Sequence, residues 1–310
     1  MTVKVSIIGA GFVGSSVASV LLASGLASEI IIVDINFEKA EGEALDLGQG
    51  APFVKPVNIQ AGHIEDCKNS DIIIFTAGAN QKPGETRLDL ANKNAKIVRD
   101  LVPKLIQTSP NTILLMVSNP VDVLTYEALQ VSGLPPERVI GSGTVLDTSR
   151  YKYSLSQQLN IDARNIHAYV AGEHGDSEVL LWSLTNVGGI SLENFCKLND
   201  IKLPDRQTVD NAVRNAAYEI IKRKGATYYA VSYAVKKICE AILRNERSVL
   251  TVSGIINGIY GINDTCLSIP TIVSRKGRDQ VLRLPLLKEE EDGVRNSARI
   301  IKEYQAKVVR

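Results

Sequence analysis

The first half of the chain alternates short apolar runs with longer segments in which apolar residues recur at helical spacing. This alternation constrains the fold more than any other feature, because each strand of a parallel sheet needs a crossover helix before the next one begins. The runs are apolar throughout, which is typical of strands covered by helices on both faces. We expect strands at 3–9, 30–34, 57–61, 72–76, 113–117 and 138–141, and helices up to about 26, from about 37, at 87–108 and at 121–131. The pattern predicts an α/β fold built on a doubly wound parallel sheet.

The second half of the chain lacks this alternation and reads as a mixed α+β region. Helical spacing covers 146–159, 205–224, 227–244 and 285–307, and strand-like pieces lie at 166–170, 178–181, 248–256 and 265–273, the last two antiparallel. The acidic run at 289–292 suits the positive end of the last helix, as solvated charge. Without a repeat or a flexible linker, we predict two domains, 1–142 and 143–310, that pack rigidly around a cleft.

Composition and charge exclude several classes of protein. The chain has 310 residues, of which 45% are hydrophobic and 22% charged, so it can bury a large core as a globular protein. Its 35 Lys and Arg nearly balance its 34 Asp and Glu, so no overall field draws it to nucleic acid or to an anionic membrane. Local charges must then hold any anionic substrate.

The cysteines and the first residues favour a reducing compartment. The cysteines, at 67, 196, 239 and 266, include no close pair, which argues against a zinc site and against a disulfide framework. The chain begins with an apolar strand pattern rather than a secretory signal, and no apolar run approaches the length of a membrane span. We expect a cytoplasmic protein without a metal.

A glycine-rich string, GAGFVG at 9–14, follows the first expected strand and opens the first expected helix. In a G-x-G-x-x-G turn, Gly9 permits the tight bend, Gly11 lets the backbone approach a pyrophosphate, and Gly14 lets helix and strand pack closely. Asp34 ends the second strand, where a carboxylate can accept hydrogen bonds from both ribose hydroxyls. No Arg or Lys neighbours Asp34, so NAD is favoured over NADP. An ordinary glycine-rich turn is the alternative.

Candidate acid/base chemistry is limited to a few residues. Among the three histidines, at 63, 167 and 174, a structural role is the default interpretation. His174 differs because glycines flank its GEHGD segment and free the backbone to present the imidazole into a cleft. Asp147 and Arg150 open an expected helix three residues apart, on one face. This spacing is consistent with two interpretations: a helical ion pair, or a part of a functional site.

Five ordered segments together resemble the L-lactate/L-malate dehydrogenase family over nearly the whole chain. They are GAGFVG at 9–14 with Asp34, TAGANQKPGETR at 76–87, VSNP at 117–120, LDTSR at 146–150 and GEHGD at 172–176. The resemblance implies a Rossmann-type NAD-binding domain followed by a substrate-binding, catalytic α+β domain. It implies that the cofactor contacts Gly9, Gly11, Phe12, Val13, Gly14, Asp34, Thr76, Ala77, Gly78 and Asn119.

The resemblance also implies roles for the catalytic residues. His174 is similar to the acid/base that protonates the oxo group during reduction, and Asp147 would fix its tautomer and favour the imidazolium. Arg150 is similar to the residue that grips the substrate carboxylate through a planar fork. Arg87 resembles an arginine on a closing loop that polarises the substrate carbonyl, worth about 3 kcal/mol if it acts as an oxyanion-hole donor. Asn119 and Thr227 match positions that line the substrate pocket.

The substrate is expected to depend on Gln81, since the malate enzymes of the family present an arginine at this position. A neutral amide leaves the second carboxylate of oxaloacetate unpaired, at a cost of several kcal/mol on burial. We therefore predict hydride transfer between NADH and pyruvate, giving L-lactate. Malate dehydrogenase is the alternative, with Gln81 exposed and Lys82 supplying the charge. A non-catalytic NAD-binding redox sensor or structural protein is a more remote alternative, because a sensor has no need of an acid/base pair beside a carboxylate clamp.

The resemblance extends to assembly and regulation. Its members form dimers or tetramers, and we expect a homotetramer. Some bacterial members respond to fructose 1,6-bisphosphate through an arginine and a histidine at a subunit interface. His167 matches that histidine, whereas Lys152 stands at the arginine position and supplies a point charge rather than a fork. Two interpretations stay open, an effector site and a surface lysine near a packed histidine.

Overall fold

The computed structural model describes residues 2–79 and 86–308, with the backbone alone at Arg87. Its centre is an eight-stranded sheet in the order β14-β13-β6-β5-β4-β1-β2-β3. The strands are β1 Lys4–Ile8, β2 Glu29–Val33, β3 Asn58–Ala61, β4 Ile72–Phe75, β5 Ile113–Met116, β6 Val139–Gly141, β13 Ser253–Ile256 and β14 Thr265–Ser268. The first six are parallel in the order 3-2-1-4-5-6, which is the Rossmann arrangement and confirms the predicted doubly wound sheet.

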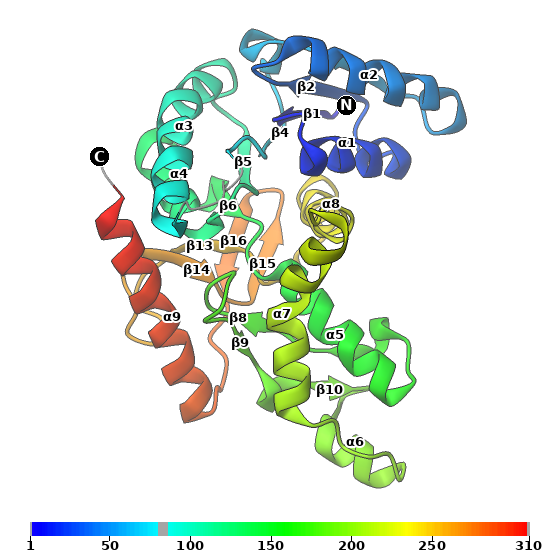
Figure 1. Cartoon of the computed structure of the whole chain (residues 1–310), viewed down its shortest axis with the longest axis vertical. Coiled ribbons are helices and arrows are strands. Elements are labelled where there is room, and N and C mark those ends of the chain that lie inside the picture. Colours follow the sequence, from blue (N-terminus) through cyan, green and yellow to red (C-terminus); the bar gives the residue numbers. More distant parts are fainter. Residues whose placement is uncertain (1, 80–85, 309–310) are drawn as a thin grey trace.

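Helices cover both faces of this sheet, as the uninterrupted apolar strands require (Figure 1). Five helices pack on or beside the sheet: α1 Phe12–Ser24, α2 Phe37–Gly50, α3 Arg87–Thr108, α4 Val121–Ser132 and α8 Tyr229–Leu243. On one face α1 lies beside α8, and on the other α3 lies beside α4. The helix α9, Lys288–Lys307, packs against β14 and α4. No helix in the described part of the chain is long and apolar enough to cross a bilayer.

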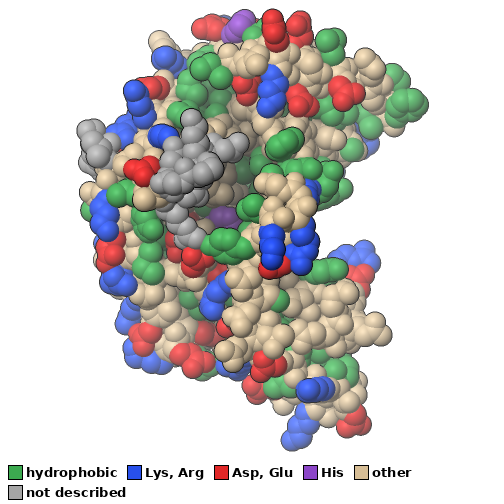
Figure 2. Space-filling view, in the orientation of Figure 1, with side chains coloured by type: hydrophobic (Ala, Val, Ile, Leu, Met, Phe, Trp, Pro, Cys, Tyr) green, Lys and Arg blue, Asp and Glu red, His purple; other side chains and the backbone are tan. Residues whose placement is uncertain are grey.

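The second half adds helices and short strands outside the central sheet. They are α5 Val145–Leu159, α6 Leu192–Leu198, α7 Arg206–Lys224, β7 Ile166–His167, β8 Val170–Ala171, β9 Val179–Leu180, β10 Asn186–Val187, β11 Ile190–Ser191, β12 Ser248–Leu250, β15 Thr271–Ser274 and β16 Gly277–Val281. These elements confirm a mixed α+β region. On the face seen in Figure 2, the molecule is hollowed between the part that carries α3 and α4 and the part that carries α7 and α8.

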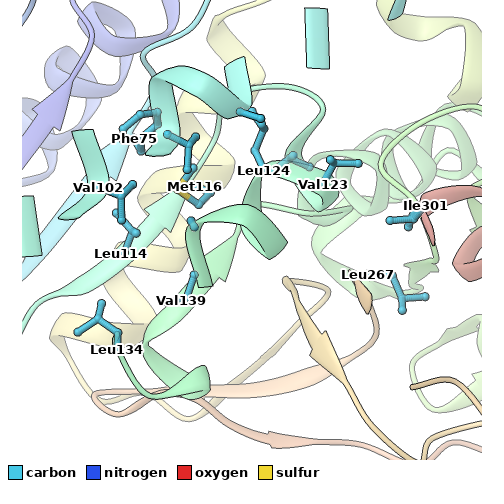
Figure 3. Packing of buried hydrophobic residues seen from close by; sticks show 14 of the residues in the cluster. Phe75, Val102, Leu114, Met116, Val123, Leu124, Leu134, Val139, Leu267 and Ile301 are labelled. Atoms are coloured by element: carbon cyan, nitrogen blue, oxygen red, sulfur yellow. The ribbon is translucent and has the colours of Figure 1, made fainter. Parts of the chain in front are cut away.

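Buried β-branched and aliphatic residues hold the central layers together. In β4 and β5 every side chain is buried, and Phe75, Leu114 and Met116 pack with residues of α3 and α4 such as Val102 and Leu124 (Figure 3). Burying side chains of this size stabilises the fold by about 1.5–3 kcal/mol each. The carboxyl ends of these strands are therefore a rigid edge on which a site can be built.

Three expected strands are each interrupted, which corrects the sequence prediction. The segment expected at 166–170 divides into β7, which pairs with β10, and β8, which pairs with β9. The segment expected at 248–256 divides into β12 and β13, because the Thr251 carbonyl accepts a hydrogen bond from the Thr144 amide instead of one in a sheet ladder. The segment expected at 265–273 divides at Pro270, which has no N–H to donate. The elements α6, β10, β11 and β16 were not predicted, since strands as short as β10 show no periodicity.

The two halves share the central sheet. The strand β13 pairs antiparallel with β6, with Ser253 opposite Gly141, and β14 follows at the outer edge. Strands from the second half thus extend a sheet begun by the first half. The division into 1–142 and 143–310 stays a prediction.

One expected surface charge is buried. Glu290 belongs to the acidic run at the start of α9 but is only 5% exposed. Its carboxylate accepts hydrogen bonds from the backbone N–H groups of Ser183 and Leu287 and from the Ser183 hydroxyl. The prediction of solvated charge is therefore wrong at this position. Glu290 ties α9 to the short helical turn at Trp182–Leu184.

Candidate active site

The turn between β1 and α1 is held by backbone hydrogen bonds and by one carboxylate. Gly9, with φ of +110°, donates its N–H to the Val33 carbonyl at 2.7 Å. The next amide, Ala10 N–H, donates to Asp34 Oδ2 at 2.7 Å, and Asn36 N–H donates to Oδ1 at 2.9 Å. Asp34 therefore fixes the turn in addition to any contact with a cofactor.

The three glycines of this turn face different surroundings. A Cβ added to Gly14 would lie 1.8 Å from the Gly9 carbonyl oxygen, and one added to Gly9 would lie 2.8 Å from the Ala77 nitrogen. A Cβ added to Gly11 would meet nothing within 4 Å. Gly9 and Gly14 are thus required by packing within the protein. At Gly11 the backbone is open to an approaching ligand, as the fingerprint predicts.

The open turn suits a dinucleotide pyrophosphate. Gly11 caps α1 without any side-chain hydrogen bond, so the first amides of the helix can serve an anion. Each Asp34 oxygen accepts one amide and, with about two lone-pair sites per oxygen, keeps capacity for ribose hydroxyls. Phe12, 69% exposed, stacks on Tyr228 with ring centroids 5.3 Å apart. Gly11 and Asp34 therefore fit NAD, although Val13 makes no contact that tests its expected role.

The loop after β4 is tied to the loop after β5 by a residue that sequence reasoning missed. Asn94, on α3 and 2% exposed, accepts a hydrogen bond from Ala79 N–H and donates one to the Asn119 carbonyl, both at 2.8 Å. Thr76 Oγ1 donates to the Gly9 carbonyl at 3.0 Å. The segment 76–78 and Asn119 thus lie next to the glycine turn. A polar residue on the buried stripe of a helix was the signal that could have identified Asn94.

Three of the predicted site residues, His174, Asp147 and Arg150, meet in one cluster around the buried carboxylate of Asp147. His174 Nδ1 lies 2.5 Å from Asp147 Oδ2, and Arg150 Nη1 donates to Asp147 Oδ1 at 2.8 Å. The side chain of Asp147 is 2% exposed, that of His174 21% and that of Arg150 15%. Asp147 and Arg150 form the helical ion pair, and Asp147 also contacts His174, while the interpretation as part of a site stays a prediction. The outer ring nitrogen of His174 remains for a substrate.

The electrostatics of the cluster favour a protonated imidazole. Burial disfavours the charged form of His174, but the Asp147 carboxylate outweighs it and raises the pKa of His174 to about 9. Burial likewise opposes the charge of Asp147, and His174 and Arg150 nevertheless hold the pKa of Asp147 below its usual value. The imidazolium and the carboxylate therefore stabilise each other at neutral pH.

Two further residues, neither predicted from the sequence, hold the histidine from its backbone side. Asp122 Oδ2 accepts the His174 N–H at 2.8 Å, and its Oδ1 accepts the Ser253 hydroxyl at 2.5 Å. Asp122 is 3% exposed, and burial raises its pKa to about 6 against the opposing hydrogen bonds from Ser253 and His174. The only sequence signal was an acidic residue in the first turn of α4, which also suits a helix N-terminus.

Five expected site residues are not tested by the contacts described here. Gln81 lies outside the described residues, and Arg87 begins α3 with its side chain outside the description. Thr227 lies half-buried between α7 and α8. No hydrogen bond or ion pair joins Lys152 to His167 among the described residues, and His167 is exposed. Across the described ranges, no three His, Cys, Asp or Glu side chains converge as a metal site, and all four cysteines are free and buried.

Comparison with known proteins agrees with this geometry along the whole chain. The family model of the lactate/malate dehydrogenase NAD binding domain matches residues 3–141, and that of the lactate/malate dehydrogenase alpha/beta C-terminal domain matches residues 144–310. An L-lactate dehydrogenase of Clostridium perfringens is 56% identical over 98% of this chain and 97% of its own length. L-lactate dehydrogenase 1 of Clostridium acetobutylicum is 54% identical over 97% of this chain and 96% of its own.

Solved structures agree as well. The minor L-lactate dehydrogenase of Enterococcus mundtii, in a ligands-bound form, superimposes with a TM-score of 0.96 at 42% identity, covering 99% of both chains. A lactate dehydrogenase from a deep-sea metagenome library of the Medee basin gives the same values. With two family models matched in order and relatives more than 50% identical over nearly the full length, the chain belongs to the lactate/malate dehydrogenase family.

Proposed function

We propose that the protein is an NAD-dependent L-lactate dehydrogenase, which transfers a hydride reversibly between NADH and pyruvate. The observation that carries this proposal is the buried cluster in which Asp147 holds His174 by one carboxylate oxygen and Arg150 by the other. An acid/base group and a guanidinium so joined suit a substrate with a reacting oxygen beside a carboxylate.

His174 supplies the proton. Its Nδ1 is fixed by Asp147, so the proton given to the 2-oxo group comes from Nε2 and returns there during lactate oxidation. Because its pKa is about 9, His174 carries this proton at neutral pH when an oxo acid binds. The bound cofactor supplies or accepts the hydride. Asp122 accepts the backbone N–H of His174 and so fixes the backbone from which the ring projects, while Asp147 holds the ring itself.

Arg150 orients the substrate. Only Nη1 of its guanidinium pairs with Asp147, so the remaining N–H groups can bind the substrate carboxylate. That contact sets which face of the reacting carbon meets the nicotinamide. Arg87 polarises the carbonyl, and Asn119 and Thr227 line the pocket, in the roles that the family resemblance implies.

The preference for pyruvate over oxaloacetate rests on two supports. Gln81 offers no positive charge to a second carboxylate, and the relatives quoted above are named as L-lactate dehydrogenases. Malate dehydrogenase is the rival function. It requires another cation, such as Lys82, to take the place of the family's arginine.

The test compares pyruvate with oxaloacetate. With purified protein, the loss of NADH absorbance should give a kcat/KM for pyruvate that is higher by orders of magnitude. A preference for oxaloacetate would replace the proposal by malate dehydrogenase. Absence of turnover with either acid would leave a cofactor-binding protein without catalysis.

We also propose a cytoplasmic homotetramer, with a dimer as the alternative, which light scattering on the purified protein distinguishes. Lys152 and His167 are proposed as ligands of fructose 1,6-bisphosphate. Burial lowers the pKa of Lys152, which implies a partly enclosed amine, and an anionic effector would favour its charged form. Unchanged kinetics and unchanged thermal stability with millimolar sugar bisphosphate would contradict this proposal.

A further inference from the structure

The loop that carries His174 ends in a second carboxyl group, which the mechanism above does not use. Glu178 is only 3% exposed, and its Oε1 is buried with no hydrogen-bond partner among the described residues. Its backbone N–H donates to the Gly175 carbonyl at 3.1 Å, so the chain turns between His174 and Glu178. A carboxyl group buried in this way, so close to an acid/base pair, requires an explanation.

Charged groups act on Glu178 from three sides. They are Asp147 and Arg150 on α5, His174 on the same loop, and Arg214 on α7. Burial, followed by the negative charge of Asp147, raises the pKa of Glu178 to about 8, although the three cations oppose that shift. Glu178 therefore responds to the same charges that bind and protonate the substrate.

The helix α7 fixes this end of the loop without neutralising the carboxyl group. Arg214 Nη2 donates to the backbone carbonyl of Glu178 at 3.2 Å, and one turn later the Tyr218 hydroxyl donates to Asp176 at 2.9 Å. In the described structure no ion pair joins Arg214 to the Glu178 carboxyl group, and the buried Nε of Arg214 also lacks a partner. The loop is anchored, but the carboxyl group has no close counter-ion.

Protonation is the favourable state for such a group, because a buried carboxylate without a hydrogen-bonded counter-ion is costly. With Glu178 neutral and Asp122 ionised above its pKa of about 6, the positive charges of His174, Arg150 and Arg214 exceed the negative charges of Asp147 and Asp122 by one. The cluster then has an excess of positive charge, which suits a monocarboxylate anion. Ionisation of Glu178 would cancel that excess.

We propose that Glu178 is a positioning residue that holds a proton and thereby leaves the charge of Arg150 available to the substrate carboxylate. Loss of this proton weakens substrate binding and leaves the chemical step unchanged. This inference rests on the proposed function for its kinetic consequence, whereas the protonation of Glu178 does not depend on that function.

The first experiment compares the wild type with Glu178→Gln, which keeps the size and neutrality of the protonated side chain. In the wild type, the KM for pyruvate should rise about five- to tenfold as pH passes through about 8, with kcat unchanged while His174 stays protonated below about 9. In Glu178→Gln this rise should be absent. Glu219→Gln on α7, which removes an exposed carboxylate, is the matched control and should keep the wild-type profile.

A second variant leaves Glu178 in place and changes a charge next to it. Arg214→Gln removes a charge that favours the ionised carboxyl group, so the KM rise should begin at higher pH than in the wild type. Coincident KM profiles for the wild type and Glu178→Gln would overturn the proposal. If KM for pyruvate begins to rise at the same pH in Arg214→Gln as in the wild type, that result would contradict the proposal as well.

Infrared spectroscopy tests the protonation directly. At neutral pH the wild type should show a carbonyl band of a protonated carboxylic acid that is missing in Glu178→Gln and present in Glu219→Gln. Identical spectra would show that Glu178 is ionised and would overturn the proposal. If the protein reduces no 2-oxo acid, the proposed function fails, and this band still decides the state of Glu178.

Discussion

The glycine turn and the catalytic cluster lie close to the same sheet edge but are built by different means. The turn is a contiguous segment in which close backbone contacts require glycine at 9 and 14, as at Gly14, where a Cβ would overlap the Gly9 carbonyl. The cluster brings together His174, Asp147 and Asp122 from separate segments through charge and burial. A site held by steric fit should be insensitive to changes in pH but should be disrupted when a side chain is made larger. A site held by charge should be less sensitive to the size of a side chain and should change with pH.

The largest effect is expected from a substitution that disrupts the cluster and leaves the turn intact. His174→Gln removes the proton donor, so kcat for pyruvate reduction should fall by about 10²–10⁴-fold. NADH binding, followed by fluorescence, should stay near the wild-type value because the turn contains no contact with His174. Loss of NADH binding in this variant would show that the two regions are not separable.

The next effect is a shift in pH dependence. In the wild type, kcat for pyruvate reduction should stay level up to the His174 pKa of about 9 and fall above that pH as the proton is lost. Asp147→Asn removes the charge that raises this pKa and leaves the opposing effect of burial, so the fall should begin at or below the ordinary value of 6.5. Between the two pKa values, activity should drop about a hundredfold. An unchanged profile would exclude His174 as the titrating group.

A pair of alanine substitutions tests the steric site. Gly14→Ala must displace the Gly9 carbonyl, and we expect a loss of about 1–3 kcal/mol in the free energy of unfolding together with weaker NADH binding. Gly11→Ala adds the same methyl group in open space, so it should unfold like the wild type and lose only NADH affinity. Both effects should be independent of pH. Equal stability of the two variants would contradict the steric interpretation.

The last effect leaves the chemical step aside and concerns the residue that holds the backbone of His174. The folded-state pKa of Asp122 is raised from 3.8 to about 6, so this group stabilises the fold below pH 3.8 and that contribution is lost as pH rises through about 6. An asparagine does not titrate, so the stability of Asp122→Asn should not fall in this way as pH rises. The stability difference between wild type and variant, measured by urea unfolding, should therefore change by up to about 3 kcal/mol over that interval. A constant difference would mean that Asp122 does not titrate there.

The contrast also explains what could be predicted from the sequence. The parallel sheet and the turn depend on local patterns, and residues such as Gly9, Gly14 and Asp34 occupy the expected positions. Asp147 and His174 could be chosen by residue type and neighbours, but their meeting in one cluster was implied only by the family resemblance.

Polar residues whose roles depend on being buried are harder to recognise in the sequence. Asn94, Asp122 and Glu178 are polar side chains whose neighbours come from distant segments, so neither their partners nor their pKa values follow from local sequence. The break between β12 and β13 has the same cause, since it depends on a hydrogen bond from Thr144. The sequence alone therefore predicts local geometry better than long-range electrostatics.

The antiparallel pairing of β13 with β6 has a consequence for synthesis of the protein. As the chain leaves the ribosome, the six parallel strands are complete long before Ser253–Ile256 has been made, so the β6 edge must wait with unpaired backbone groups. Open strand edges attract other strands, including those of neighbouring nascent chains. The last step of folding, in which the carboxyl-terminal strands cover that edge, is therefore also the step that protects the protein from aggregation.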